Sequence, residues 1–166
     1  MHRTFLEYFC AAEIVSRFEK KQTLSFDELK MEIFLTHYQD STWHEVLLLI
    51  CGMVASHFAS QLIKMLVLCA KIDKNEWDNP LRELLFVRAC LDEAIEPKQV
   101  KEVSQSFQLK LRQSITDQVL SIRITAVETL AQYPKSLEML LLFKQIATDD
   151  KHEYVRSTAV KSLAKH

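Results

Sequence analysis

The amino-acid sequence predicts an all-α fold in which successive helices form a helical array. Only one of the 166 residues is glycine and three are proline, so the residues that favour tight turns between strands are scarce. Leu, Ala, Glu, Lys, Gln and Arg dominate the composition, and all of them favour helices. The last third of the chain also repeats itself with a period of 33 residues, which is typical of stacked helical units.

The first half of the chain contains signals for three helices. The first helix is predicted over about residues 4–20, and its apolar side chains are spread over more than one face. Because several of them are aromatic, we expect this helix to be buried on several sides. Ser25 and Glu28 have the spacing of a capping box, which predicts the start of a second helix. Thr42 and Glu45 have the same spacing and predict the start of a third.

The middle of the chain contains signals for three further helices. The first of them is predicted over about residues 58–72. Asn79 as N-cap and Pro80 at the first helical position predict the next start. Pro97 predicts another, which we expect to continue to about Gln113.

The repeat in the last third consists of seven residue pairs, each separated by 33 positions. The pairs are Asp117–Asp150, Ile122–Val155, Arg123–Arg156, Ala126–Ala159, Val127–Val160, Leu130–Leu163 and Ala131–Ala164. In each unit three apolar residues spaced by four form an inward stripe, and its small alanine lets a neighbouring helix approach closely. Each aspartate precedes an arginine by six positions, which places the acid in a turn and the arginine one turn into the helix. We expect Asp117, Arg123, Asp150 and Arg156 to form a salt-bridge ladder between adjacent units.

The pattern Val-Arg-x-x-Ala-Val-x-x-Leu-Ala in this repeat resembles the HEAT repeat and its relatives. The resemblance covers residues 116–166 and implies that these residues form HEAT-like repeats, an α-solenoid, at the end of the helical array. Residues 135–148 would then form the first helix of the second unit. The chain is accordingly divided into a helical region, residues 1–115, and the HEAT-like repeats, residues 116–166.

A second resemblance involves residues 2–12, His-Arg-Thr-Phe-Leu-Glu-Tyr-Phe-Cys-Ala-Ala. They are similar to the stretch that ends the winged-helix module of NACHT-type (STAND or NLR-like) signal-transduction NTPases. Residues 43–49 also look like the helical region that follows in bacterial members with C-terminal repeats. The resemblance implies that residues 1–115 follow such a winged-helix module. It also implies that His2 contacts the β-phosphate of ADP in a parent protein.

This chain departs from that family in one essential feature. It has no G-x-x-x-x-G-K-[ST] motif, because its one glycine is Gly52. A phosphate-binding loop is therefore missing, and ATP or ADP with Mg²⁺ is expected only in an upstream NACHT NTPase module. We accordingly expect the chain to be a piece of such a protein.

Other residues that could carry chemistry do not form a recognisable catalytic or metal site. No two cysteines lie within four residues of each other, so Cys10, Cys51, Cys69 and Cys90 are predicted to be small core residues in a reducing compartment. His37 and His44, with Asp40 between them, lack the spacing of a zinc motif. Cys51 and His57 form only a weak nucleophile–base candidate, because apolar residues surround the cysteine.

Charge and hydropathy narrow the possible locations and partners. Residues 1–96 contain 10 Lys and Arg against 15 Asp and Glu, whereas residues 97–166 contain 11 against 7. The excess of basic residues in 97–166 is small, and acidic residues lie among them, so we expect nucleic acid less than protein as a partner. The first residues lack the n-region and the small-residue cleavage site of a signal peptide, so we expect none. The longest apolar stretch, residues 46–55, is too short to span a bilayer. We therefore expect a soluble, cytoplasmic protein that does not associate with membranes.

These observations favour a non-catalytic interaction and regulatory scaffold that recognises a protein partner or another large trigger ligand. Two alternatives remain open. The chain could be a stand-alone HEAT-like protein that acts as a bilin lyase-type enzyme subunit or chaperone. It could also be a helical repeat that binds nucleic acid through basic residues of its last third.

Overall fold

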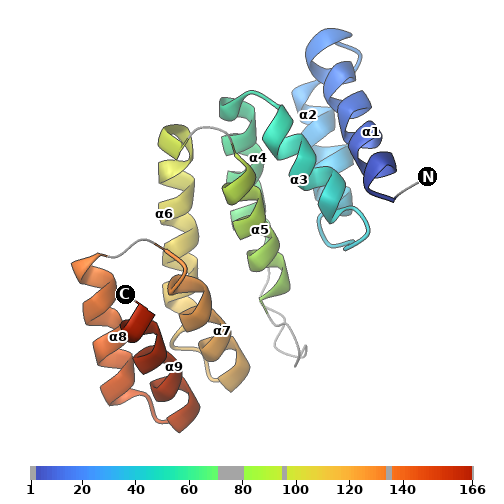
Figure 1. Ribbon diagram of the computed structural model, residues 1–166. Coiled ribbons are helices and arrows are strands. Elements are labelled where there is room, and N and C mark those ends of the chain that lie inside the picture. The colour runs from blue at the N-terminus through green and yellow to red at the C-terminus, as the bar shows by residue number, and fades with distance from the viewer. Residues whose placement is uncertain (1–2, 71–80, 95–96, 134–135, 166) are drawn as a thin grey trace. The chain divides into compact units, whose positions relative to one another are not determined.

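The computed structural model describes residues 3–70, 81–94, 97–133 and 136–165. All regular secondary structure in these ranges is helical, which confirms the prediction of an all-α protein (Figure 1). In chain order the helices are α1 (Arg3–Val15), η1 (Ser16–Lys20), α2 (Phe26–Glu28), η2 (Leu29–Leu35), α3 (His44–Met53), α4 (Ser56–Cys69), α5 (Arg82–Glu93), α6 (Pro97–Ser114), α7 (Leu120–Leu130), α8 (Leu137–Asp149) and α9 (Glu153–Lys165). The elements η1 and η2 are π-helical.

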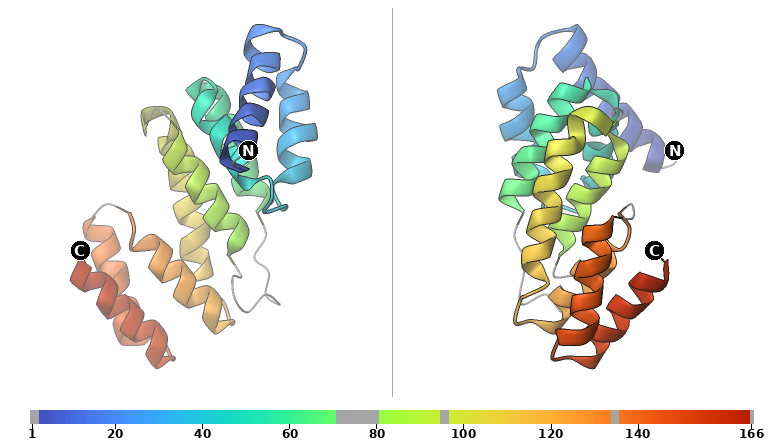
Figure 2. Two further views of the ribbon diagram at one scale, coloured as in Figure 1. Left: turned by 45° about the vertical axis from the view of Figure 1, so that its right-hand side comes forward. Right: turned by 90° about the vertical axis from the view of Figure 1, so that its left-hand side faces the viewer.

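The chain forms two compact units. The first unit comprises Met1–Ala70 and Glu83–Gln105, and the second comprises Lys71–Arg82 and Ser106–His166. In the first unit α1 packs against α3, and η2 packs against α4. In the second unit α9 packs against both α7 and α8, as Figure 2 shows.

Helix α1 is buried on one side only, which corrects the expectation that it is covered on several sides. Ala11 and Ile14 are buried, whereas Phe5 and Phe9 are 60% and 59% exposed. The reason is geometric: α3 covers one stripe of α1, and residues on the opposite side of a helix cannot reach the same neighbour.

The two predicted capping boxes have different outcomes. At Ser25 the box is confirmed: the Glu28 backbone N–H donates to Ser25 Oγ (3.2 Å), and the Ser25 N–H donates to Glu28 Oε2 (2.7 Å). At Thr42 the prediction is wrong, because Asp40 Oδ1 accepts both the backbone N–H (2.9 Å) and the hydroxyl (2.7 Å) of Thr42. These bonds form an Asx-type turn before α3, so Thr42 does not cap the helix.

The remaining helix starts depend on local chemistry to different degrees. Helix α6 begins at Pro97 as predicted. Helix α4 begins at Ser56, two positions before the expected residue, and the N–H of the preceding Ala55 donates to Glu19 Oε1 (3.1 Å). The predicted cap at Asn79 and Pro80 lies outside the described residues.

The core of the second unit contains most of the inward stripe that the repeat predicts. Ile122, Ala126, Leu130, Val155 and Ala159 are fully buried. Phe107, Leu111 and Phe143 complete this core from α6 and α8. No helix in the described ranges is both long enough and apolar enough to cross a membrane.

Candidate functional site

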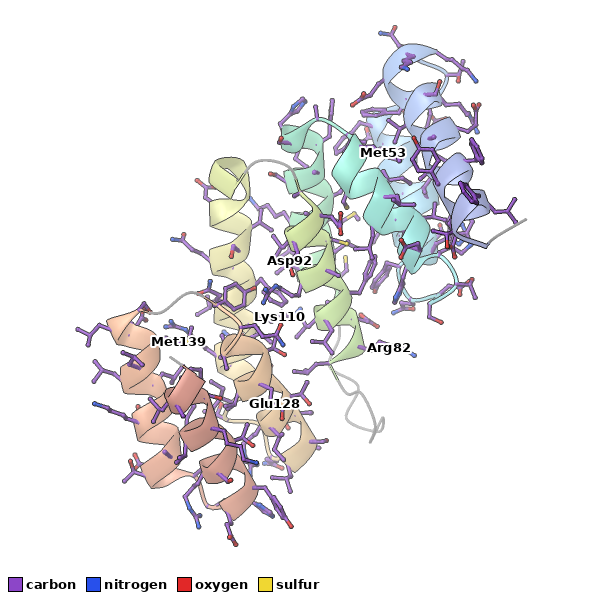
Figure 3. The ribbon with its side chains drawn as sticks, viewed as in Figure 1. Met53, Arg82, Asp92, Lys110, Glu128 and Met139 are labelled. Atoms are coloured by element: carbon purple, nitrogen blue, oxygen red, sulfur yellow. The ribbon has the colours of Figure 1, made fainter. Side chains whose placement is uncertain are left out.

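A groove of ≈ 430 Å³ lies in the second unit between residues of the α6–α7 turn and residues of α8 and the α8–α9 turn. We call it the turn groove. Part of its lining is apolar and comes from Ile115, Leu142 and Ile146; Lys151 and Asp149 contribute charge. In Figure 3, the labels Lys110, Glu128 and Met139 mark α6, α7 and α8, three helices that supply residues to the lining of the groove. The groove thus combines an apolar surface with charged groups of both signs.

Arg123 forms one wall of the turn groove as an almost completely buried charge. Its Nε lies 3.0 Å from Asp150 Oδ2, and its Nη2 lies 3.4 Å from Oδ1. The two side chains are only 4% and 10% exposed. Arg123 Nη1 also donates to the backbone carbonyls of Asp117 (2.8 Å) and Gln118 (3.2 Å). One guanidinium therefore links the two inter-helix turns, and the planar fork of arginine suits this bidentate geometry.

The arginines and aspartates of the repeat make equivalent bonds in its two units. Asp117 Oδ1 accepts from the Val119 N–H (2.9 Å), and Asp150 Oδ1 accepts from the His152 N–H (2.8 Å). Arg123 donates to the carbonyl of Asp117, and Arg156 donates in the same way to the carbonyl of Asp150 (2.9 Å). The ion pair itself joins Arg123 to Asp150, the aspartate of the following unit.

Arg112 stands at the edge of the turn groove and forms an ion pair with Glu138 at the start of α8. The hydrogen bond and positive charge of Arg112 lower the pKa of Glu138. The Nε of Arg112 is buried and makes no hydrogen bond within the described residues.

The residues that line the turn groove carry groups that can contact a ligand. Their side chains are aliphatic, amide, carboxylate or cationic, with a single hydroxyl at Thr116. This hydroxyl donates to the backbone carbonyl of Gln113 (3.0 Å), an ordinary bond for the end of a helix. No nucleophile in the lining is paired with a histidine base.

A second surface of interest is the aromatic end of α1. Thr4, Phe5, Tyr8 and Phe9 line a shallow hollow of ≈ 440 Å³, which we call the α1 patch. The rings of Tyr8 and Phe9 lie edge to face with centroids 5.7 Å apart. His2, which the family resemblance assigns to nucleotide sensing, lies outside the described residues.

The histidines considered as metal ligands are engaged in packing. His37 stacks on Trp43 with ring centroids 3.9 Å apart, and His44 stacks on Phe86 at 4.1 Å. The Nε2 of His44 also lies 2.9 Å from the carbonyl oxygen of Tyr38. In the part of the chain that the structure describes, no group of three His, Cys, Asp or Glu side chains could hold a metal ion.

The cysteines occupy different environments, so the expectation that all are core residues holds only in part. Cys51 and Cys90 are buried, Cys69 is half-buried and Cys10 is exposed on α1. Burial, together with a hydrogen bond to Cys51, raises the pKa of the Cys90 thiol, so this thiol stays protonated. His57 is exposed and packs on Phe58, with centroids 3.9 Å apart.

Sequence reasoning missed the Arg112–Glu138 pair and the apolar surface beside it. A signal for the pair exists, because a basic residue in the last turn of one helix and an acidic residue in the first turn of another each suit the helix dipole. Nothing in the sequence spacing places the two residues together.

Within the described residues, the turn groove and the α1 patch are two surfaces that could contact other molecules. None of the protein-family models, curated proteins or solved structures compared with this chain matches it.

Proposed function

We propose that the chain is a non-catalytic interaction and regulatory scaffold whose residues 116–166 are HEAT-like repeats of an α-solenoid. The observation that carries this proposal is the recurrence of the same turn bonds 33 residues apart, at Asp117 with Arg123 and at Asp150 with Arg156. Two unrelated amphipathic helices would have no reason to share these bonds. Repeated units of this kind stack side by side and are commonly used to bind proteins.

The turn groove supports a protein segment as the ligand. Its apolar lining can accept an aliphatic or aromatic side chain of a bound segment. Lys151 and Asp149 at the same site can orient a peptide through its charges. A polypeptide offers all of these groups within a short stretch.

Peptides selected from a random displayed library on the 166-residue chain test this function. Leu142→Gln changes the apolar lining of the turn groove, and Lys161→Gln is a matched change at an exposed position outside it. Selected peptides should lose at least about tenfold in affinity for Leu142→Gln, a loss on the scale of one buried contact residue. Binding to Lys161→Gln should be unchanged. A library that yields no binder, or binders indifferent to Leu142→Gln, would contradict the proposal.

We further propose that this scaffold is the sensor-side segment of a NACHT-type signalling NTPase. The similarity of residues 2–12 to the end of a winged-helix module supports this origin. The exposed α1 patch fits it as well, because an adjoining module would cover those aromatic side chains. Reading the coding sequence directly upstream of Met1 is the test. An in-frame phosphate-binding motif supports the proposal, and an unrelated upstream gene contradicts it.

A further inference from the structure

The lining of the turn groove contains an apolar row that ends in a carboxylate. Leu142, Ile146 and Asp149 follow one another along α8 at spacings of four and three residues, which places them on one face of the helix. Ile115, which directly follows α6, adds apolar surface to the same groove. Both walls of the groove come from described segments of one compact unit. A side chain lying along the row therefore meets apolar surface first and a carboxylate at its end.

Ion pairs compensate the two arginines of the groove. Arg123 is paired with Asp150, and Arg112 is paired with Glu138, just outside the lining. The lining charges outside these two pairs are Asp117, Asp149 and Lys151, two negative and one positive. The groove thus presents a small excess of negative charge to a bound molecule, which favours a cationic ligand group over an anionic one.

Asp149 is the acidic residue of the groove that is most available to a ligand. It is exposed, and its carboxylate makes no hydrogen bond or ion pair within the described residues. Asp149 is also the last residue of α8, and the C-terminal end of a helix carries partial negative charge. The carboxylate and the helix end therefore both favour a cation at this end of the row.

We propose that the turn groove binds a segment of a partner protein through a lysine or arginine, whose apolar stem lies over Ile146 and whose cationic head reaches Asp149. The inference rests on the proposed function and names the chemistry of the bound segment. Ile146 and Asp149 are separated by about 4.5 Å along the helix axis, a distance that the four-carbon stem of a lysine can span. An acidic side chain would bring like charges together, and a purely aliphatic one would remove water from Asp149 without replacing it.

Peptides selected from a random displayed library on the 166-residue chain are the probe, and the library is sequenced before and after selection. Recovered peptides should be enriched in a lysine or arginine beside aliphatic or aromatic residues. One recovered binder is then synthesised with its lysine acetylated, or with citrulline in place of its arginine, which removes the charge and keeps the stem. Its affinity, measured by fluorescence anisotropy, should fall about two- to fivefold, the range expected for an exposed ion pair.

Variants of the chain test the same contact from the other side. Asp149→Lys should weaken the unmodified binder at least about fivefold, and a new selection on this variant should favour acidic peptides. Lys151→Gln should strengthen the binder, because it removes the positive charge that opposes a cation in the groove. Glu128→Lys is the matched control: it makes the same change of charge at an exposed position outside the groove and should leave binding unchanged. Circular dichroism checks that each variant is folded.

Failure of this inference is distinguishable from failure of the proposed function. Binders without a basic residue, or binders equally tight on Asp149→Lys, overturn the inference; if Leu142→Gln still weakens them, the proposed function stands. A library that yields no binder contradicts both. Dimers that persist in the double variant Phe5→Ser/Phe9→Ser and disappear with Asp149→Lys would identify a second copy of the chain as the occupant and overturn the assignment to a partner protein.

Discussion

Arg123 shows how a single side chain can connect two segments that are distant in sequence. Its guanidinium meets the carboxylate of Asp150 and two backbone carbonyls of the α6–α7 turn. Burial of a charge costs free energy unless the charge is paired and hydrogen-bonded. Here each of the three guanidinium nitrogens has an acceptor, so the buried arginine fixes the separation of the two turns.

Replacing Arg123 should therefore destabilise the chain far more than the equivalent change at Arg156. Arg123→Ala leaves the Asp150 carboxylate buried and unpaired, which should lower the free energy of unfolding by about 3–5 kcal/mol. Arg156→Ala removes one bond of a half-buried side chain and should cost about 0.5–1.5 kcal/mol. Urea unfolding followed by circular dichroism measures both values. Equal costs at the two positions would show that Arg123 has no special structural role.

At the scale of single helices, Ser25 sets the start of α2 through its capping box with Glu28. Ser25→Ala should lower the free energy of unfolding by about 1 kcal/mol, the usual cost of losing an N-cap side chain. Thr42→Ala is a suitable comparison, because Thr42 does not cap α3, and it should leave the N-terminus of that helix intact.

The same cap predicts a pH dependence. Hydrogen bonds from the Ser25 backbone N–H and hydroxyl lower the pKa of Glu28. A carboxyl group whose pKa is lowered by folding stabilises the protein above its ordinary pKa, and this stabilisation is lost as the pH falls through the lowered value. The Tm difference between the wild type and Ser25→Ala should thus be full at neutral pH and shrink in acid. A difference that grows in acid would contradict this account of the cap.

Local signals predicted helix starts correctly where no neighbouring side chain competed for the capping residue. Ser25 with Glu28 and Pro97 are such cases, because a cap or a ring needs no distant partner. Thr42 failed because Asp40, two residues earlier, offers a competing acceptor. The exposure of Cys10 could not be predicted, since it depends on which stripe of α1 faces α3.

The candidate site was less predictable than the helices. The period of 33 residues singled out Arg123 and Asp150, but their pairing spans 27 positions and depends on how α9 packs against α7. Arg112 and Glu138 belong to no repeat or spacing motif in the sequence. Their ion pair forms only because α6 and α8 pack together.

At the scale of the whole molecule, the α1 patch should cause self-association. Phe5, Leu6, Tyr8 and Phe9 are 48–60% exposed on one short helix, and contiguous apolar surface of this kind promotes association. Sedimentation velocity should show a mass that rises with protein concentration. The double variant Phe5→Ser/Phe9→Ser should shift the chain toward monomer, whereas Leu68→Ser, at an exposed apolar residue of α4, should not. A strict monomer at high concentration would contradict this prediction.

The isolated chain should neither bind nor hydrolyse ATP. Its one glycine, Gly52, lies inside α3, so the sequence offers no glycine-rich loop to cradle phosphates. Titration calorimetry with ATP and Mg²⁺ should show no saturable heat. Micromolar binding would exclude the assignment of nucleotide chemistry to a separate upstream module.

We propose that residues 116–166 form two equivalent units joined by the Arg123–Asp150 pair. A double-mutant cycle measures the coupling free energy between these two side chains. Arg123→Ala, Asp150→Ala and the double variant are compared with the wild type in urea unfolding. Because the pair is buried and bidentate, we predict a coupling free energy of about 1–3 kcal/mol between the two positions. Effects that add to within about 0.5 kcal/mol would mean that the two side chains act independently, and the account of the repeat would be contradicted.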